Sequence, residues 1–151
     1  MIIKSLENLN SISIKIADNI SNSDCILLIG EIGVGKTTFT RSFINYLQKK
    51  ENLKPTAVLS PTFNLLYEYE ISNLKVMHYD LYRLKNSEEV KQLNIFDNNE
   101  NAIKIIEWPD LIKDNADDRL ELNFNYLKKE SERELKLQGY GKWKNFKINE
   151  F

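Results

Sequence analysis

The stretch with the clearest chemical meaning is the glycine-rich segment 30–37, GEIGVGKT, which fits the pattern G-x-x-x-x-G-K-[ST]. In such a loop, successive backbone N–H groups point inward and hydrogen-bond phosphate oxygens. The ammonium group of Lys36 can reach the β- and γ-phosphates of a nucleotide, and the hydroxyl of Thr37 can ligate Mg²⁺. We therefore predict a phosphate-binding loop whose nucleotide contacts come from Glu31, Ile32, Gly33, Val34, Gly35, Lys36, Thr37 and Thr38.

The residues on either side of the loop agree with this prediction. The apolar run Cys25–Ile29 precedes it and is typical of a buried parallel strand. After the loop, apolar residues recur at helical spacing, at Phe39, Phe43, Ile44 and Leu47. The order strand, glycine loop, helix distinguishes a phosphate-binding loop from a turn that merely joins two elements. The sequence thus indicates a nucleotide-binding protein.

Two carboxylates follow apolar, strand-like runs and are candidates for metal and water chemistry. Asp80 ends the run 76–79, and Glu107 ends the run 103–106. Ligands of open α/β sheets bind at the carboxyl ends of the strands, so both carboxylates are expected beside the loop. Either one can hold Mg²⁺ or its waters while the other orients an attacking water. The alternative for each is to cap a helix or to pair with Arg83.

Three further residues are considered for this site. Thr62 belongs to the segment 60–62, Ser-Pro-Thr, whose hydroxyls can sense a γ-phosphate, although a simple strand break explains the proline equally well. Trp108 is expected either to stack near the nucleotide or to pack in the core. His78 lies inside a strand pattern, which favours a structural role over a catalytic one.

The remaining patterns predict how these residues are positioned. We expect an edge strand at 1–4, a helix capped by Ser5 that runs to about Ile20, an extended segment from Val58, a hairpin over 65–79, a short helix capped by Ser87, strands at 102–106 and 120–126, a partner strand through Leu135 and Leu137, and a last short helix around Trp143. The tyrosines at 67, 69, 79 and 82 are expected on the sheet surface. The fold class is α/β: a single P-loop NTPase-like domain over residues 1–151, with a mixed sheet and helices on both faces.

Composition narrows the possible functions. A chain of 151 residues with 42% hydrophobic and 28% charged residues suits one globular domain. The net charge of −1 does not indicate an extended nucleic-acid surface, although 21 basic residues permit a local basic patch. Cys25 is the only cysteine, which excludes an intrachain disulfide and favours a buried thiol. No signal peptide or membrane-length apolar run is present, so we expect a cytoplasmic protein that does not contact a membrane.

Four motifs occur in order along the chain: GEIGVGKTT at 30–38, SPTF at 60–63, HYDLYR at 78–83 and IEWP at 106–109. Together they resemble the TsaE (YjeE) family, the small bacterial ATPases of tRNA N6-threonylcarbamoyladenosine biosynthesis. The resemblance implies ATP and Mg²⁺ as ligands and a complex with the TsaB and TsaD proteins. In that complex TsaD transfers the threonylcarbamoyl group, and the contact of this chain with tRNA is expected to be indirect.

The resemblance also implies roles for individual residues. Lys36, Asp80 and Glu107 take the catalytic positions, and Thr37 joins Glu107 as a metal ligand. Thr62 belongs to a switch-like segment.

At four other positions the resemblance implies a specific placement. Arg133 matches an arginine that approaches the nucleotide. Glu31 and Val34 replace residues that are commonly aspartate and alanine, and in this loop type both side chains are expected to face outward. Asn94 stands where a glycine is usual and is expected in the left-handed conformation, which asparagine tolerates.

Other classes of protein with a phosphate-binding loop require further residues, which this sequence can be searched for. A small-molecule kinase, our alternative to the ATPase, usually brings several arginines over the phosphoryl group in a lid, but this chain has only Arg41, Arg83, Arg119 and Arg133 and no lid-like insertion. A GTP-dependent switch protein would carry an Asn-Lys-x-Asp motif, which is absent. A module that binds ATP without turnover stays open, because a partner can complete a hydrolytic site in trans.

Overall fold

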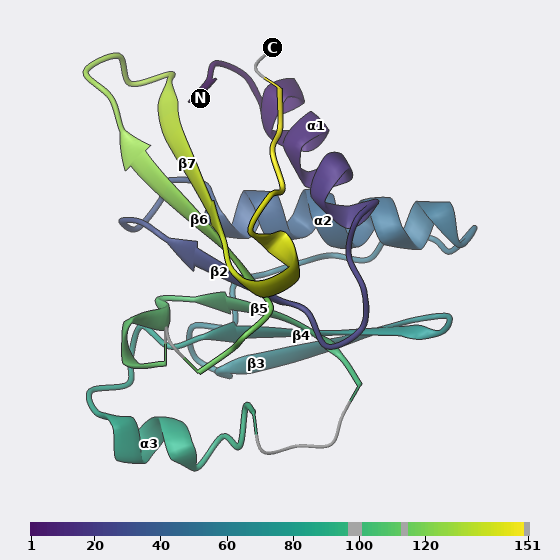
Figure 1. Ribbon diagram of the computed structural model, residues 1–151, viewed down its shortest axis with the longest axis vertical. Coiled ribbons are helices and arrows are strands. Elements are labelled where there is room, and N and C mark those ends of the chain that lie inside the picture. Colours follow the sequence, from purple (N-terminus) through teal and green to yellow (C-terminus); the bar gives the residue numbers. More distant parts are fainter. Residues whose placement is uncertain (97–100, 113–114, 150–151) are drawn as a thin grey trace.

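The computed structural model describes residues 1–96, 101–112 and 115–149. It contains a seven-stranded sheet in the order β1-β7-β6-β2-β5-β4-β3 (Figure 1). The strands are β1 (Ile2–Ile3), β2 (Cys25–Ile29), β3 (Leu66–Ile71), β4 (Leu74–Asp80), β5 (Ile103–Glu107), β6 (Arg119–Tyr126) and β7 (Arg133–Gly139). The helices are α1 (Leu6–Ala17), α2 (Lys36–Lys50) and α3 (Ser87–Lys91), with 3₁₀ turns at Pro109–Leu111 and Gly141–Trp143.

The sheet is mixed, as the sequence predicts. Strand β2 pairs in parallel with β5 and β6, and β5 pairs in parallel with β4. Strands β3 and β7 pair antiparallel with β4 and β6. The apolar run of β2 is continuous, and all five residues of β5, Lys104 and Glu107 included, are buried, because both strands are covered on both faces. Strand β3 lies at the edge and alternates polar with apolar residues.

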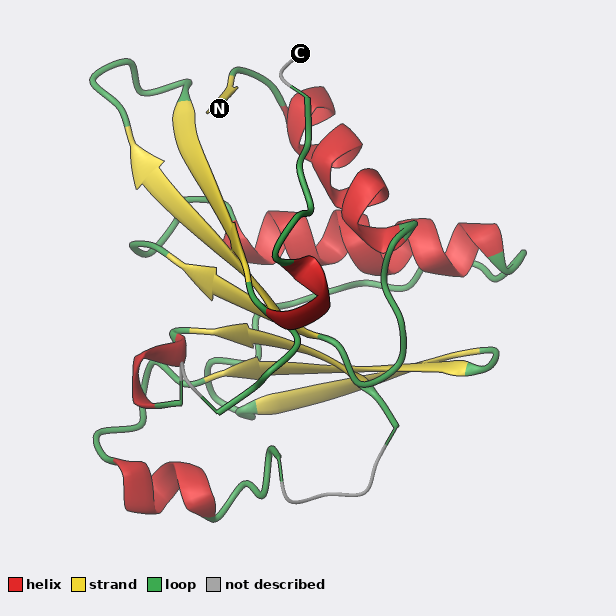
Figure 2. Cartoon of the chain, in the orientation of Figure 1, coloured by secondary structure: helices red, strands yellow, loops and turns green. Residues whose placement is uncertain are grey.

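Two apolar clusters cover the two faces of the sheet. On one face, Ile26 and Leu28 of β2 pack with residues of α1 and α2. On the other face, Cys25 and Leu27 pack with Val90 of α3 and neighbouring residues. This division follows from the alternation of side chains along β2. Figure 2 shows α1 and α2 together on one side and α3 on the other, so the predicted α/β fold with helices on both faces is confirmed.

Local expectations are mostly confirmed, with three differences. The side chain of Ser5 caps α1 by accepting from the Asn8 N–H at 3.2 Å, but the helix ends at Ala17 and not near Ile20. The segment at Val58 forms no strand, because its carbonyl accepts from the Arg41 guanidinium at 3.0 and 3.2 Å instead of from a ladder.

The third difference concerns α3. Its cap is Asn86, whose side chain accepts from the Glu89 N–H at 3.0 Å, and the expected cap Ser87 is the first helical residue. None of the helices in the described ranges has the length and apolar character needed to cross a bilayer.

The strand register decides where the site forms. Glu107, the last residue of β5, is paired with Leu28 of β2 on one side and with Asp80 of β4 on the other. The glycine-rich loop begins directly after β2, at Gly30. One row across three parallel strands therefore brings both candidate carboxylates to the mouth of the loop.

Candidate functional site

A cavity of about 360 Å³ opens at the carboxyl ends of β2, β4 and β5. Its walls come from the glycine-rich loop, the first turn of α2, the segment before β3 and the ends of β4 and β5. The lining residues are Ile32, Gly33, Gly35, Lys36, Thr37, Thr38, Ser60, Thr62, Asp80, Tyr82, Glu107 and Trp108. Four sequence segments far apart in the chain therefore meet at one concave surface.

The loop presents donors to this cavity. Gly35 precedes α2 with φ +121°, a conformation that side chains rarely adopt, and contributes no side-chain cap to the helix. The N–H groups of the first turn of α2 are consequently available to an anion, and the helix dipole favours negative charge there. The loop and the helix start form a phosphate-sized cradle of donors.

Lys36 adds a positive charge to this cradle. Its Nζ donates to the carbonyls of Gly30 and Glu31 at 2.7 and 2.9 Å and lies 4.4 Å from the centroid of the Trp108 ring. Burial lowers the pKa of the Lys36 ammonium, while the charges of Glu107 and Asp80 oppose that change. The ammonium group is thus held by neutral carbonyls, from which a phosphate can draw it.

Glu107 is the carboxylate closest to the loop threonine. The Thr37 hydroxyl donates to Glu107 Oε1 at 3.1 Å, and Nε2 of His78 lies 2.9 Å from the same oxygen. The carboxylate is only 3% exposed. A hydroxyl oxygen and a carboxylate oxygen held this close are a pair that suits a hard, oxygen-preferring cation.

Asp80 has different partners from those of Glu107. Its Oδ2 accepts from the hydroxyls of Ser60 and Thr62, both at 2.9 Å, and its Oδ1 accepts from the Tyr82 N–H at 3.0 Å. Two of these three hydrogen bonds, those from Ser60 and Thr62, anchor the Ser-Pro-Thr segment to the end of β4. Asp80 therefore holds two hydroxyls at the wall of the cavity.

An aromatic pair bounds the cavity near Lys36. The rings of Tyr82 and Trp108 lie 4.8 Å apart between centroids. Trp108 adopts left-handed backbone angles, φ 56° and ψ 58°, which cost about 1–2 kcal/mol for a residue with a side chain. This conformation follows directly after Glu107 and turns the ring toward Lys36.

The family model described as "Threonylcarbamoyl adenosine biosynthesis protein TsaE" matches residues 3–135, most of the chain. The chain belongs to the TsaE family. The curated tRNA threonylcarbamoyladenosine biosynthesis protein TsaE of Rickettsia conorii is 41% identical over 98 residues, which cover 65% of this chain and 54% of the relative. The TsaE protein of Haemophilus influenzae is 39% identical over 84 residues, 55% of this chain and 50% of the relative.

The chain thus spans about half the length of these two TsaE relatives. The crystal structure of Bacillus subtilis YdiB superposes with a TM-score of 0.70 at 23% identity, and the match covers 95% of this chain and 86% of YdiB. This likeness supports the same fold.

Most of the residues predicted for the TsaE-type site line the cavity, and three do not. Glu31 is exposed beside it. Val34 is buried, 3% exposed, and packs in the core below the loop, so the expectation that its side chain faces outward is wrong. Arg133 lies 4.4 Å from the Tyr126 ring, and the Tyr126 hydroxyl donates to the Ile32 carbonyl at 2.7 Å. Its approach to a nucleotide stays a prediction.

Sequence reasoning missed two residues of this site. Tyr82 was expected on the sheet surface but lines the cavity. His78 was assigned a structural role, yet its ring meets Glu107. The spacing of His78 and Asp80, two residues apart on one strand, was a signal that both side chains share a face.

Asn94 has φ 49°, so its expected left-handed conformation is confirmed.

Proposed function

We propose that this TsaE-family chain binds and hydrolyses ATP with Mg²⁺ in support of tRNA threonylcarbamoyladenosine modification. The observation that carries the proposal is the 3.1 Å contact between the Thr37 hydroxyl and the Glu107 carboxylate, inside a cavity that also contains Lys36. Phosphoryl transfer requires positive charge, metal ligands and hydrogen-bond donors to the phosphate oxygens, and these groups can supply all three. The proposed role is carried out in the cytoplasm.

The donor chemistry at this place fits Mg²⁺. Mg²⁺ takes oxygen ligands and is usually held by one or two protein groups together with substrate phosphates and waters. Thr37 and Glu107 offer two such oxygens. Within the described ranges, no three His, Cys, Asp or Glu side chains gather into a metal-binding group, which agrees with a site that relies on phosphates for its remaining ligands.

Each residue then has a defined task. Lys36 and the amides at the start of α2 bind the phosphate chain. When bound, Mg²⁺ neutralises charge on the β- and γ-phosphate oxygens. Glu107 and Thr37 would hold the metal ion through their side-chain oxygens. Asp80 holds the hydroxyls of Ser60 and Thr62 at the wall of the cavity, a position from which they can order an attacking water.

Because the curated relatives are named as tRNA threonylcarbamoyladenosine biosynthesis proteins, we assign the chain to the same pathway. The proposal includes a complex with TsaB and TsaD, in which turnover of ATP is stimulated by these partners. Activation in trans is a known property of phosphate-binding-loop hydrolases whose own site lacks a charge-stabilising group. Contact with tRNA is then made by the partners rather than by this chain.

The experiment is phosphate release from ATP by the purified chain, alone and with TsaB, TsaD and tRNA. Lys36→Ala and Thr37→Val are expected to lose about 10²–10³-fold in rate, since each removes a group that meets charge in the transition state. Thr37→Ser keeps the hydroxyl and serves as the matched control, with most activity retained. An ATP hydrolysis rate that stays at background in the complete mixture would contradict the proposal. Transfer of phosphate to a small acceptor would indicate a kinase.

A further inference from the structure

His78 is the one histidine of the chain, and it is fully buried on β4. Its side chain lies on the same strand face as Asp80, two residues on, and as Val76, two residues before. Its Nε2 is 2.9 Å from Glu107 Oε1. Its Nδ1 is also buried and has no hydrogen-bond partner among the described residues. A buried ring with a single partner calls for an explanation, because buried polar groups are normally satisfied.

The partner determines which nitrogen carries the proton. An ionised carboxylate only accepts hydrogen bonds, so Nε2 must donate to Glu107. In a ring with one proton, Nδ1 then carries the lone pair. This is the less costly arrangement, since a buried N–H without an acceptor is rarer in proteins than an acceptor without a donor. The tautomer with the proton on Nε2 is therefore inferred from the contacts.

Two donors meet at one carboxylate oxygen. Thr37 approaches Glu107 Oε1 from the start of α2 at 3.1 Å, and His78 approaches it from the neighbouring strand at 2.9 Å. A histidine that only filled the core would make its hydrogen bond with any nearby acceptor. This one contacts the same carboxylate oxygen as the loop threonine does.

We propose that His78 is a positioning residue for the metal site: its Nε2–H holds the Glu107 carboxylate in the orientation in which it faces Thr37. The inference rests on the proposed function for the role of Glu107. Hydrogen bonds to a metal-binding carboxylate usually contribute 10- to 100-fold to metal affinity or activity. Without His78, Glu107 would keep its charge but lose its fixed orientation.

The tautomer can be tested without any turnover of ATP. Because the chain has a single histidine, ¹⁵N–¹H correlation of the imidazole reports on His78 alone. We expect one tautomer with the proton on Nε2, and in Glu107→Ala we expect this preference to weaken. A ring protonated on Nδ1, or a ring unchanged by Glu107→Ala, would overturn the proposal.

Metal affinity tests the consequence. Mn²⁺ binding to the ADP-bound protein, followed by electron paramagnetic resonance, is expected to weaken about 10- to 100-fold in His78→Met. His78→Gln keeps an N–H donor near the position of Nε2 and should recover part of the affinity. Affinity for ADP without metal should not change in either variant.

Val76→Ala is the matched control, since it alters the same buried strand face without touching Glu107. If His78→Met weakens Mn²⁺ binding no more than Val76→Ala does, the proposal is overturned. Failure of the wild-type protein to bind Mn²⁺ with ADP would contradict the proposed function instead, while the tautomer measurement would still decide the contact between His78 and Glu107.

Discussion

The two ends of the parallel strands bury charge to the same degree and use it differently. At the carboxyl end, Glu107 is 3% exposed; toward the amino end, Arg119 at the start of β6 and its partner Glu121 are 8% and 1% exposed. Glu107 meets a hydroxyl and an imidazole beside an open cavity. Glu121 meets the Arg119 guanidinium at 3.1 Å.

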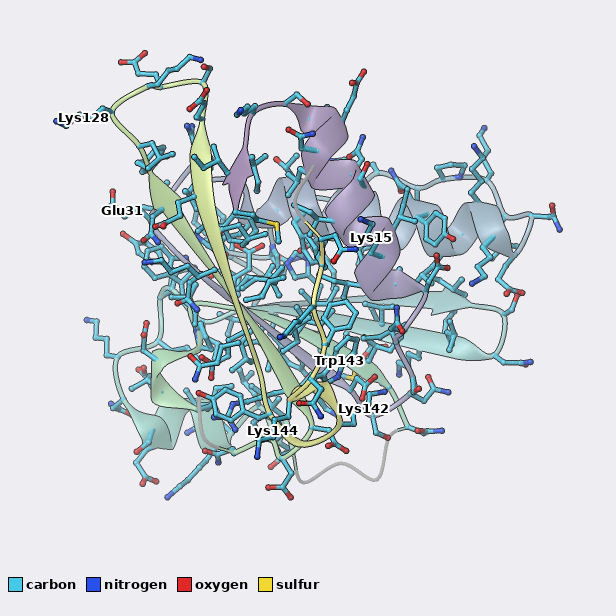
Figure 3. The ribbon with its side chains drawn as sticks, turned by 45° about the horizontal axis from the view of Figure 1, so that its top comes forward. Lys15, Glu31, Lys128, Lys142, Trp143 and Lys144 are labelled. Atoms are coloured by element: carbon cyan, nitrogen blue, oxygen red, sulfur yellow. The ribbon has the colours of Figure 1, made fainter. Side chains whose placement is uncertain are left out.

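The amino end is closed by further pairings of this kind. The Arg119 guanidinium donates to the Ala116 carbonyl at 2.9 Å and stacks on the Tyr140 ring at 3.6 Å. Asp24 forms an ion pair with Lys142. In Figure 3, Lys142 and Trp143 lie well apart from Glu31 of the glycine-rich loop. The opposite charges at this end neutralise each other.

This difference shows that buried charge alone does not indicate a site. At the amino end, each of these charges has an opposite charge as its partner, which is the ordinary condition for burying it. At the carboxyl end, Lys36 donates to backbone carbonyls and Glu107 accepts from the Thr37 hydroxyl beside the open cavity, so their charges are available to a ligand. The type of partner, rather than the degree of burial, separates the functional end from the structural end.

The largest effect is expected from breaking the pair at the structural end. Glu121→Leu removes the carboxylate that pairs with the buried Arg119 guanidinium, and should lower the free energy of unfolding by about 3–5 kcal/mol in urea titration. ATP hydrolysis per folded molecule should not change. The double variant Arg119→Met/Glu121→Leu removes both charges and should recover most of the loss. If the double variant is as unstable as the single one, the pair is not what stabilises this end.

The second effect belongs to the functional end. Asp80→Ala removes the acceptor for the hydroxyls of Ser60 and Thr62, and should lower ATP hydrolysis about 10- to 100-fold, since a hydrogen bond to a charged group contributes about 1.5–3 kcal/mol. Ser60→Ala keeps the bond from Thr62 and should lose less. Equal rates for Asp80→Ala and the wild type would show that this anchoring does not serve catalysis.

The sequence predicts the parts of the functional end that are local in the chain. The loop motif, the strand before it and the helix after it are all read within residues 25–50, and the structure confirms these elements. Asp80 and Glu107 are found because an apolar run ending in a carboxylate is a local pattern. Their placement beside the loop follows from the general rule for parallel sheets.

The parts that the sequence does not reveal depend on contacts between segments distant in the chain. The meeting of His78 with Glu107 requires the register of β4 on β5, which no local pattern gives. The position of Arg133 depends on how the hairpin of β6 and β7 stands over the loop. The pairing of Arg119 with Glu121 could have been expected from their spacing on one strand face, but its burial required knowledge of what covers it.

A third, smaller effect tests the loop backbone. Gly35 has φ +121° with open space where a Cβ would lie, so Gly35→Ala brings strain without a clash. The strain should lower the free energy of unfolding by about 1–2 kcal/mol, and nucleotide affinity should fall as the loop relaxes away from its conformation. Nucleotide titration and urea unfolding measure the two losses. Unchanged affinity would mean that the loop adapts to its ligand.

The smallest effect concerns the thiol at the structural end. Cys25 is 2% exposed, and burial raises its pKa to about 12 even though Lys104 and Arg119 lie near enough to lower it. The folded state thus disfavours the thiolate, so stability is intact below the pKa of an exposed thiol, about 8.5, and falls as the pH rises toward 12. Cys25→Ala should lower the free energy of unfolding by about 1 kcal/mol at pH 7. The decrease of this free energy at alkaline pH should be smaller in the variant, because the titrating thiol is gone.

A thiol reagent at pH 8 should label Cys25 in urea and leave it unlabelled in the native protein, because the thiolate is the reactive form and the side chain is covered. Rapid native labelling would mean that the amino end opens to solvent. Its charges would then be as accessible as those beside the cavity, and the distinction between the two ends would fail. Slow labelling at the rate of global unfolding would instead show that the amino end stays closed for as long as the protein is folded.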